Sequence, residues 1–193
     1  MTSLNLHSAC DNSLNWATNE LNAAAKLEQQ KRNFIRIIEA NHGTIKSLCR
    51  SYYPSAEDQK DAFQDVVLQL WKSFESFRGE SEIGTWIYRV SLNTLITKIR
   101  KEKTKIVTES IGDSEESISI VGTDSEIELL QIVIQSLKEL DKAIVILYLE
   151  GYKNKEISQI LNLTATNVST RLNRVREELK AKFKSLPHEL KQP

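Results

Sequence analysis

The sequence predicts an all-α protein: two small helical domains joined by a flexible acidic linker, the C-terminal one containing a helix-turn-helix. Apolar residues recur at steps of three and four over residues 28–105 and 125–184, which is the period of amphipathic helices. Between these stretches lies a segment with two glycines, several serines and a run of acid but no sustained period, which is typical of a mobile tether. We expect an N-terminal extension at 1–26, a first domain at 27–105, a linker at 106–123, a second domain at 124–186 and a tail at 187–193.

Charge is arranged in blocks along the chain. The 26 basic and 26 acidic residues among the 193 cancel, so the net charge does not indicate a partner. Residues 85–105 carry six basic residues and one acidic one, residues 106–128 carry seven acidic residues and no basic one, and residues 165–184 carry six basic and two acidic residues. Two separate basic blocks argue against a helical protein-interaction module that does not bind DNA.

The cysteines and the hydropathy indicate a cytoplasmic protein. Cys10 and Cys49 are too few for a disulfide scaffold, and they indicate ordinary thiols in a reducing compartment. His42 and Cys49 lie seven apart on one predicted helix, but a solvated histidine and a core-edge thiol are favoured over a metal site. No apolar run is long enough to span a bilayer and the N-terminus does not resemble a signal peptide, so we expect neither direct membrane insertion nor a metal or cofactor.

The first domain is predicted to begin with two helices, and the second of them has an apolar face and a polar, acidic face. The N-terminal extension is expected to be helical from Ser13, and a helix over residues 28–52 ends before Pro54. Ser55 and Asp58 form a capping pair for the next helix. The apolar stripe of that helix is expected to be core: Ala62, Phe63, Val66, Val67, Leu70, Trp71 and Phe74. On its opposite face, polar and acidic residues surround one outward leucine, and we expect this face to bind a partner: Asp61, Gln64, Asp65, Leu68 and Lys72.

A third helix of the first domain combines aromatic and basic residues. Residues 78–84 have two glycines and small polar residues, which predicts a loop. The helix that follows begins with Trp86 and Tyr88 and ends in a basic cluster, and single-stranded nucleic acid binds rings that stack on bases and cations that follow phosphates. The alternative is that aromatic residues early in an amphipathic helix pack in the apolar core. We expect core packing of at least one of Trp86 and Tyr88, and of Phe77.

The second domain has the spacing of a helix-turn-helix. A helix from Leu140 is expected to be closed by Gly151 and to bury Ile144, Val145, Leu147, Tyr148 and Leu149. The motif follows, with anchoring residues Ile157, Leu161, Leu163, Val168 and Leu172, small Ser158 at the helix crossing and Asn162 in the turn. Thr164 is the expected N-cap of its second helix. The outward face of that second helix carries donors suited to base edges and phosphates: Thr166, Asn167, Ser169, Thr170, Arg171, Asn173 and Arg174. The alternative is that this face is only charged and solvated.

Several motifs of the first domain occur in a fixed order. They are D-x-x-Q-D (Asp61, Gln64, Asp65), L-W (Leu70, Trp71), F-R-G-E-S (residues 77–81), T-W-I-Y-R-V (85–90) and L-N-T (92–94). Together they resemble conserved region two of the extracytoplasmic-function group of bacterial sigma factors, and the helix-turn-helix resembles region four. The resemblance therefore covers both domains and implies a sigma factor, which binds bacterial core RNA polymerase and promoter DNA. Family members are often held by an anti-sigma factor as well.

The resemblance also implies a role for particular residues. The core-polymerase-binding residues would be Asp61, Gln64, Asp65 and Leu68, docked on the clamp helices of the largest subunit. The minus-ten DNA-binding residues would be Arg78, Glu80, Ser81, Ile83, Thr85, Trp86, Tyr88, Arg89, Asn93, Lys98, Arg100 and Lys101. The outward residues of the helix-turn-helix would bind the minus-thirty-five element, and the linker would pass through the active-site cleft and RNA exit path. At one position of this surface the chain differs from the family, because many members have Asp where Thr97 stands.

The same residues argue against two other function classes, an enzyme and a conventional transcriptional regulator. No Gly-rich phosphate loop, metal-ligand cluster or nucleophile with a base at recognisable spacing occurs, so an enzyme is not expected. A conventional helix-turn-helix regulator would bind duplex DNA through its C-terminal domain without docking on polymerase. Such a regulator has no need of the surface at residues 61–105.

Overall fold

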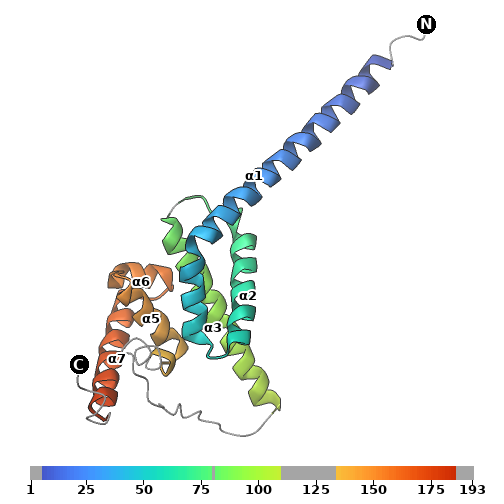
Figure 1. Cartoon of the computed structure of the whole chain (residues 1–193). Helices are drawn as coiled ribbons and strands as arrows, with labels where there is room; N and C mark the ends of the chain where they lie inside the picture. Colours follow the sequence, from blue (N-terminus) through green and yellow to red (C-terminus); the bar gives the residue numbers. More distant parts are fainter. Residues whose placement is uncertain (1–5, 80, 110–133, 186–193) are drawn as a thin grey trace. The chain divides into compact units, whose positions relative to one another are not determined.

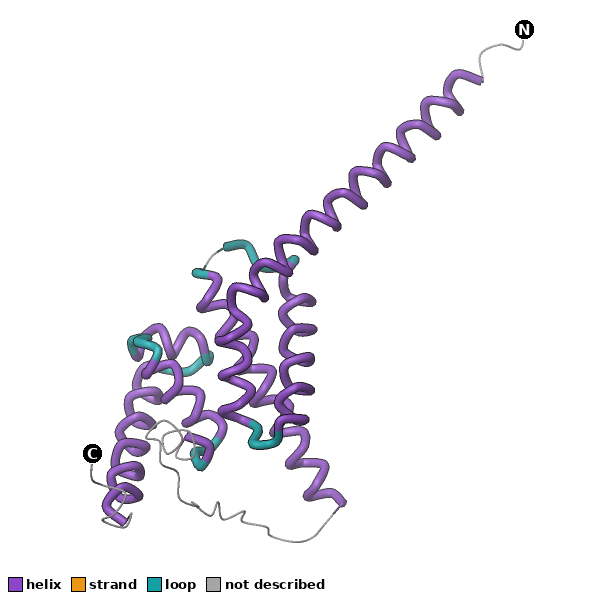
Figure 2. Tube along the Cα trace, in the orientation of Figure 1, coloured by secondary structure: helices purple, strands orange, loops and turns teal. Residues whose placement is uncertain are grey.

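Helices make up the regular structure of the described chain. The computed structural model describes residues 6–79, 81–109 and 134–185. No strand occurs in these ranges (Figure 2), which confirms the all-α prediction. Figure 1 labels the helices, which are α1 (Leu6–Tyr52), α2 (Ala56–Phe74), α3 (Ile83–Glu109), α5 (Glu139–Leu149), α6 (Asn154–Ile160) and α7 (Ala165–Ser185).

The chain divides into two compact units, Met1–His42 and Gly43–Pro193. In the first unit the described residues all belong to α1, which begins before Ser13 and continues without a break. Leu21 and Leu27 are exposed on this helix. The predicted boundary after residue 26 falls inside α1, so no change of secondary structure marks it, and the domain boundaries stay predictions.

In the second unit, the end of α1 packs with α2 and α3 around an apolar core. Ser55 caps α2, because its Oγ accepts hydrogen bonds from the backbone N–H groups of Glu57 and Asp58 at 3.2 and 3.4 Å. This confirms the predicted start of the helix. The centre of the predicted stripe is buried, and its other members are partly exposed. The apolar residues with no more than 2% exposure here are Ile45, Leu48, Cys49, Ala62, Val66, Leu70, Ile87, Leu92 and Leu95.

Helix α3 extends beyond both of its predicted ends. It begins at Ile83, so the last two residues of the predicted loop are helical, and it continues to Glu109, four residues into the predicted linker. The sequence has no glycine or proline between Gly84 and Gly112, so nothing in this stretch stops the helix earlier. The rest of the predicted linker lies outside the described residues.

Helices α5, α6 and α7 surround a second apolar cluster in the same unit. Gly151 closes α5 with φ 89°, and Tyr152 N–H donates to the Leu147 carbonyl at 3.1 Å, as in a glycine-terminated helix. The predicted burial of Tyr148 and Leu149 is wrong, since they are 44% and 58% exposed on the last turn. The buried side chains include Ile144, Leu147, Ile157, Ile160, Val168, Leu172 and Val175.

Candidate nucleic-acid interface

The turn between α6 and α7 has the predicted geometry. Asn162 adopts φ 53°, the left-handed conformation that Asn tolerates better than most residues. Leu163 N–H donates to the carbonyl of Ser158 at 2.8 Å, and Ser158 is 8% exposed where the helices cross. Thr164 Oγ1 accepts from the backbone N–H of Asn167 at 3.1 Å, which confirms the N-cap. The turn therefore fixes α7 against α6 as a recognition helix requires.

Most of the predicted outward face of α7 is open to solvent. Exposed residues are Thr166, Asn167, Thr170, Asn173 and Arg174, whereas Ser169 and Arg171 are partly buried. Both arginines were predicted only as donors to DNA, but in the structure each of them already donates to a carboxylate. Arg171 Nη1 donates to Asp141 Oδ1 at 2.8 Å and Arg174 Nη2 donates to Asp141 Oδ2 at 2.6 Å.

Asp141 is a buried acid that sequence reasoning missed. It lies in the first turn of α5 and is 3% exposed. A signal was present, because an acidic residue stands three and four positions before buried Ile144 and Val145, on the apolar side of the helix. Charged residues are rarely buried without a partner, so such a position predicts a basic one nearby.

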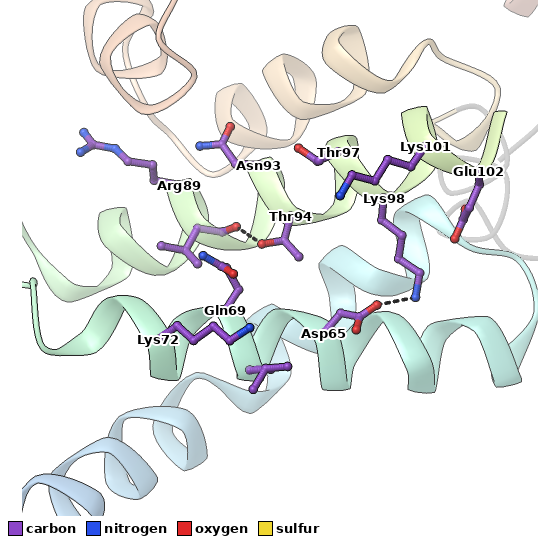
Figure 3. Close-up of a pocket in the computed structure, with 12 residues that line it drawn as sticks. Asp65, Gln69, Lys72, Arg89, Asn93, Thr94, Thr97, Lys98, Lys101 and Glu102 are labelled. Atoms are coloured by element: carbon purple, nitrogen blue, oxygen red, sulfur yellow. Dashed lines mark hydrogen bonds and ion pairs between the residues drawn. The ribbon is translucent and has the colours of Figure 1, made fainter. Parts of the chain in front are cut away.

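The acidic face of α2 is exposed as predicted. Leu68 is 51% exposed, and Asp61, Gln64 and Asp65 are exposed beside it. Asp65 Oδ2 accepts a hydrogen bond from Lys98 Nζ of α3 at 2.6 Å (Figure 3). Although burial opposes its charge, the hydrogen bond to Asp65 raises the pKa of Lys98 above its usual value. The pair thus joins one predicted polymerase-binding residue to one predicted phosphate-binding residue.

A groove of about 710 Å³, lined mainly by polar and charged residues of both signs, runs between α2 and α3. Four of its lining residues follow one another at steps of four along α3 and so share one face. They are Arg89, Asn93, Thr97 and Lys101 (Figure 3). Gln69 and Lys72 line the α2 side. Lys72 was expected on the partner-facing side of this helix, whereas no role was predicted for Gln69. Cations and amides here would suit a polar, anionic chain.

The two aromatic rings of α3 are core residues in this structure. Trp86 is 7% exposed and packs on Phe77 and Phe74, with ring centroids 4.9 and 6.2 Å apart. Tyr88 is 8% exposed and lies edge-on to Tyr152 at 5.7 Å. Both rings are therefore buried in this structure, and their place along a strand's path stays a prediction. The alternative interpretation of core aromatics agrees with the burial of both. Trp86 packs on Phe74 and Phe77, whereas Tyr88, two residues further and so on another side of the helix, packs on Tyr152.

The other predicted minus-ten residues differ in exposure. Arg78, Arg89, Asn93, Arg100 and Lys101 are exposed, whereas Ser81, Ile83, Thr85 and Lys98 are partly buried. Arg89 Nη2 donates to the carbonyl of Gln159 at 3.5 Å, and Thr85 Oγ1 lies 3.5 Å from the Tyr152 hydroxyl. Glu80 lies outside the described residues. A basic, mainly polar surface remains.

A reactive thiol, a metal site or a membrane-spanning helix would indicate another kind of function. Cys49 is a buried free thiol, and burial raises its pKa to about 11. Across residues 6–79, 81–109 and 134–185 no three His, Cys, Asp or Glu side chains gather as a metal site would require. No helix within these ranges has both the length and the hydropathy to cross a membrane.

Comparison with known proteins decides the family. Residues 37–105 match the model of sigma-70 region 2, and residues 127–179 match that of sigma-70 region 4. The ECF RNA polymerase sigma-E factor of Haemophilus influenzae is 30% identical over 171 residues, which cover 81% of this chain and 90% of that protein. The chain belongs to the extracytoplasmic-function sigma factors. The Escherichia coli sigma-E factor is 28% identical over 172 residues, covering 81% of this chain and 89% of its own.

Two solved structures share the fold. The sigma factor RpoE of Bartonella quintana, in complex with the anti-sigma factor NepR, superposes with a TM-score of 0.62 at 19% identity, covering 81% of this chain and 98% of that one. CnrH, in complex with the cytosolic domain of CnrY, gives a TM-score of 0.56 at 17% identity, covering 81% and 91%. These likenesses agree with the sigma-factor assignment at the level of the fold.

Proposed function

We propose that this protein directs bacterial RNA polymerase to promoters and supports both the melting of the minus-ten element and the recognition of the minus-thirty-five duplex. The observation that carries the proposal is the presence of sigma-70 regions 2 and 4 in one chain, in that order. Each region also presents a surface suited to its part of the task. The domain boundaries that we propose are those expected from the sequence.

The polymerase-docking surface is the exposed face of α2. Leu68 offers apolar area for burial, and Asp61 and Asp65 beside it offer negative charge, which together suit a basic, grooved partner. Gln64 adds a hydrogen-bonding group on the same face. By resemblance, the partner is the pair of clamp helices of the largest polymerase subunit.

The melted minus-ten strand is proposed to lie along the polar side of α3. Arg89 and Asn93 line the groove with Lys98 and Lys101, so cations and an amide follow one another along the helix. Flipping a base costs a few kcal/mol, which a preformed pocket can offset. We propose that the segment from Arg78 to α3 supplies this pocket, with Ser81, Ile83 and Thr85. Trp86 and Tyr88 support the helix from within.

The minus-thirty-five duplex is proposed to receive α7 in its major groove. The polar side chains Thr166, Asn167, Thr170 and Asn173 are exposed on the first half of that helix. Hydroxyls and amides of this kind bond to base edges, whereas arginines can bond to guanine or to phosphate. Ser169 lies at the margin of the same surface.

The proposed task is binding and involves no covalent chemistry. Because its partners are polymerase and promoter DNA, we propose that the protein acts in the cytoplasm. The solved neighbour RpoE is a complex with the anti-sigma factor NepR, so we propose an anti-sigma factor as a further partner. No cofactor is required for any of these contacts.

A charge reversal tests the docking surface. Asp65→Lys should prevent the full-length protein from forming a complex with bacterial core RNA polymerase, as measured by size-exclusion chromatography and by competition binding. The control is Glu75→Lys, which reverses an exposed charge just beyond the end of α2 and should leave assembly intact. Unchanged affinity of Asp65→Lys would overturn the docking assignment. Duplex DNA binding with no polymerase complex for the wild type would instead favour a conventional helix-turn-helix regulator.

A further inference from the structure

Two arginines of the recognition helix α7 are held by one buried carboxylate. Asp141 lies in the first turn of α5, where the positive end of the helix dipole stabilises a negative charge. Its side chain is 5% exposed, and each of its two oxygens accepts a hydrogen bond from a different arginine, Arg171 at 2.8 Å and Arg174 at 2.6 Å. The carboxylate therefore bridges two side chains that lie three residues apart on α7.

The arginines are anchored at one end and open at the other. Arg171 also donates from Nε to Asn167 Oδ1 at 2.8 Å, so two of its donors are fixed. Its side chain is 29% exposed and that of Arg174 is 57% exposed. Each guanidinium has five N–H donors, so both retain donors that face solvent on the DNA-facing helix. Their geometry is set before any DNA arrives.

We propose that Asp141 is a positioning residue for sequence discrimination: it orients Arg171 and Arg174 toward base edges and restrains them from contacting phosphates without sequence preference. The proposal rests on the proposed function of α7. Two physical effects support it. An arginine that is ordered in the free protein loses less conformational entropy on binding, and a bidentate contact to guanine tolerates only a narrow range of orientations. An unrestrained arginine can reach several phosphates, which raises affinity for any duplex.

The test replaces the carboxylate with an amide of the same shape. Holoenzyme made from core polymerase and full-length Asp141→Asn is bound to a duplex promoter library whose upstream element is randomised, and bound DNA is sequenced. In parallel, the full-length chain alone is titrated with salt on one duplex of arbitrary sequence. The matched control is Glu177→Gln, which also removes one negative charge from this domain and frees one cation, because Glu177 pairs with Lys180 in solvent.

The expected result is a tenfold or greater loss of discrimination at the positions that Arg171 and Arg174 read. The slope of log affinity against log salt should steepen by about one to two, because each added phosphate contact contributes about 0.9. Glu177→Gln should keep the wild-type discrimination. A merely structural role for Asp141 would weaken specific and arbitrary duplexes alike without a steeper slope, and that result would overturn the proposal.

A second set of variants keeps the proposal testable if Asp141→Asn does not fold. Arg171→Lys with Arg174→Lys retains both charges but lacks the planar fork, so it should lose discrimination while binding arbitrary duplex as well as the wild type does. Unchanged discrimination would refute the inference. Failure of the proposed function is distinguishable, since wild-type holoenzyme would then enrich no upstream sequence at all.

Discussion

Truncation of Leu68 should weaken polymerase binding without unfolding the protein. Leu68 is 51% exposed on α2, whereas Leu70, two residues further along the same helix, is 0% exposed. Fully burying a leucine contributes about 1.5–3 kcal/mol, so covering the exposed half should contribute about 1 kcal/mol. Leu68→Ala should therefore raise the Kd for core polymerase about fivefold. Leu70→Ala should instead lower the free energy of unfolding by about 2–5 kcal/mol, because it leaves a cavity.

The assay is competition of unlabelled variants against labelled wild-type protein for core polymerase, with urea unfolding of each variant alongside. Leu27→Ala is the control for removing an exposed leucine, since Leu27 is 44% exposed on α1, outside the proposed surface. It should bind polymerase as the wild type does. The reasoning is refuted if Leu68→Ala binds with wild-type affinity, or if Leu27→Ala loses as much affinity as Leu68→Ala.

Three further predictions concern buried or capping groups. Burial lowers the pKa of Lys142 to about 8 from 10.5, so between these values the folded state binds fewer protons and stability rises with pH. The wild type should gain about 1 kcal/mol relative to Lys142→Met from pH 7 to 9 in urea unfolding, and parallel pH profiles would contradict this. Thr164→Ala should cost about 1 kcal/mol of stability by removing the cap of α7, whereas the same loss in Thr166→Ala would argue against capping. In a Cys10→Ser background, Cys49 should react with a thiol reagent at pH 8 only as fast as the domain opens, and rapid labelling of native protein would show an accessible thiol.

Local signals in the sequence predicted the architecture well. The Ser55 cap, the Asn162 turn and the Thr164 cap each depend on a few adjacent residues, and the structure shows all three. The sequence placed Leu68 on the exposed face of α2 because helix geometry alone separates it from the buried stripe. It misplaced the end of α3, because the acidic residues and serines of 106–123 indicated a linker although no glycine or proline stands before Gly112.

The sequence was least informative where tertiary packing decides. Periodicity could not tell whether Trp86 and Tyr88 stack on a ligand or fill the core, since an amphipathic helix allows both, and the structure shows both buried. Tyr148 belongs to the last turn of α5, where the helix leaves the core and Arg176 covers its ring at 5.2 Å. The pairing of Asp141 with two arginines some thirty residues away depends on the packing of α5 against α7. Such contacts are not readable from local patterns.

The central claim is that this chain makes core RNA polymerase open a promoter. The most direct measurement mixes the purified full-length protein with bacterial core polymerase and promoter DNA and reads the chemical reactivity of unpaired thymines on the non-template strand. The account predicts reactive thymines around the minus-ten element only when protein and core are both present. Binding to duplex DNA without core, and no reactive thymines with it, would contradict the account.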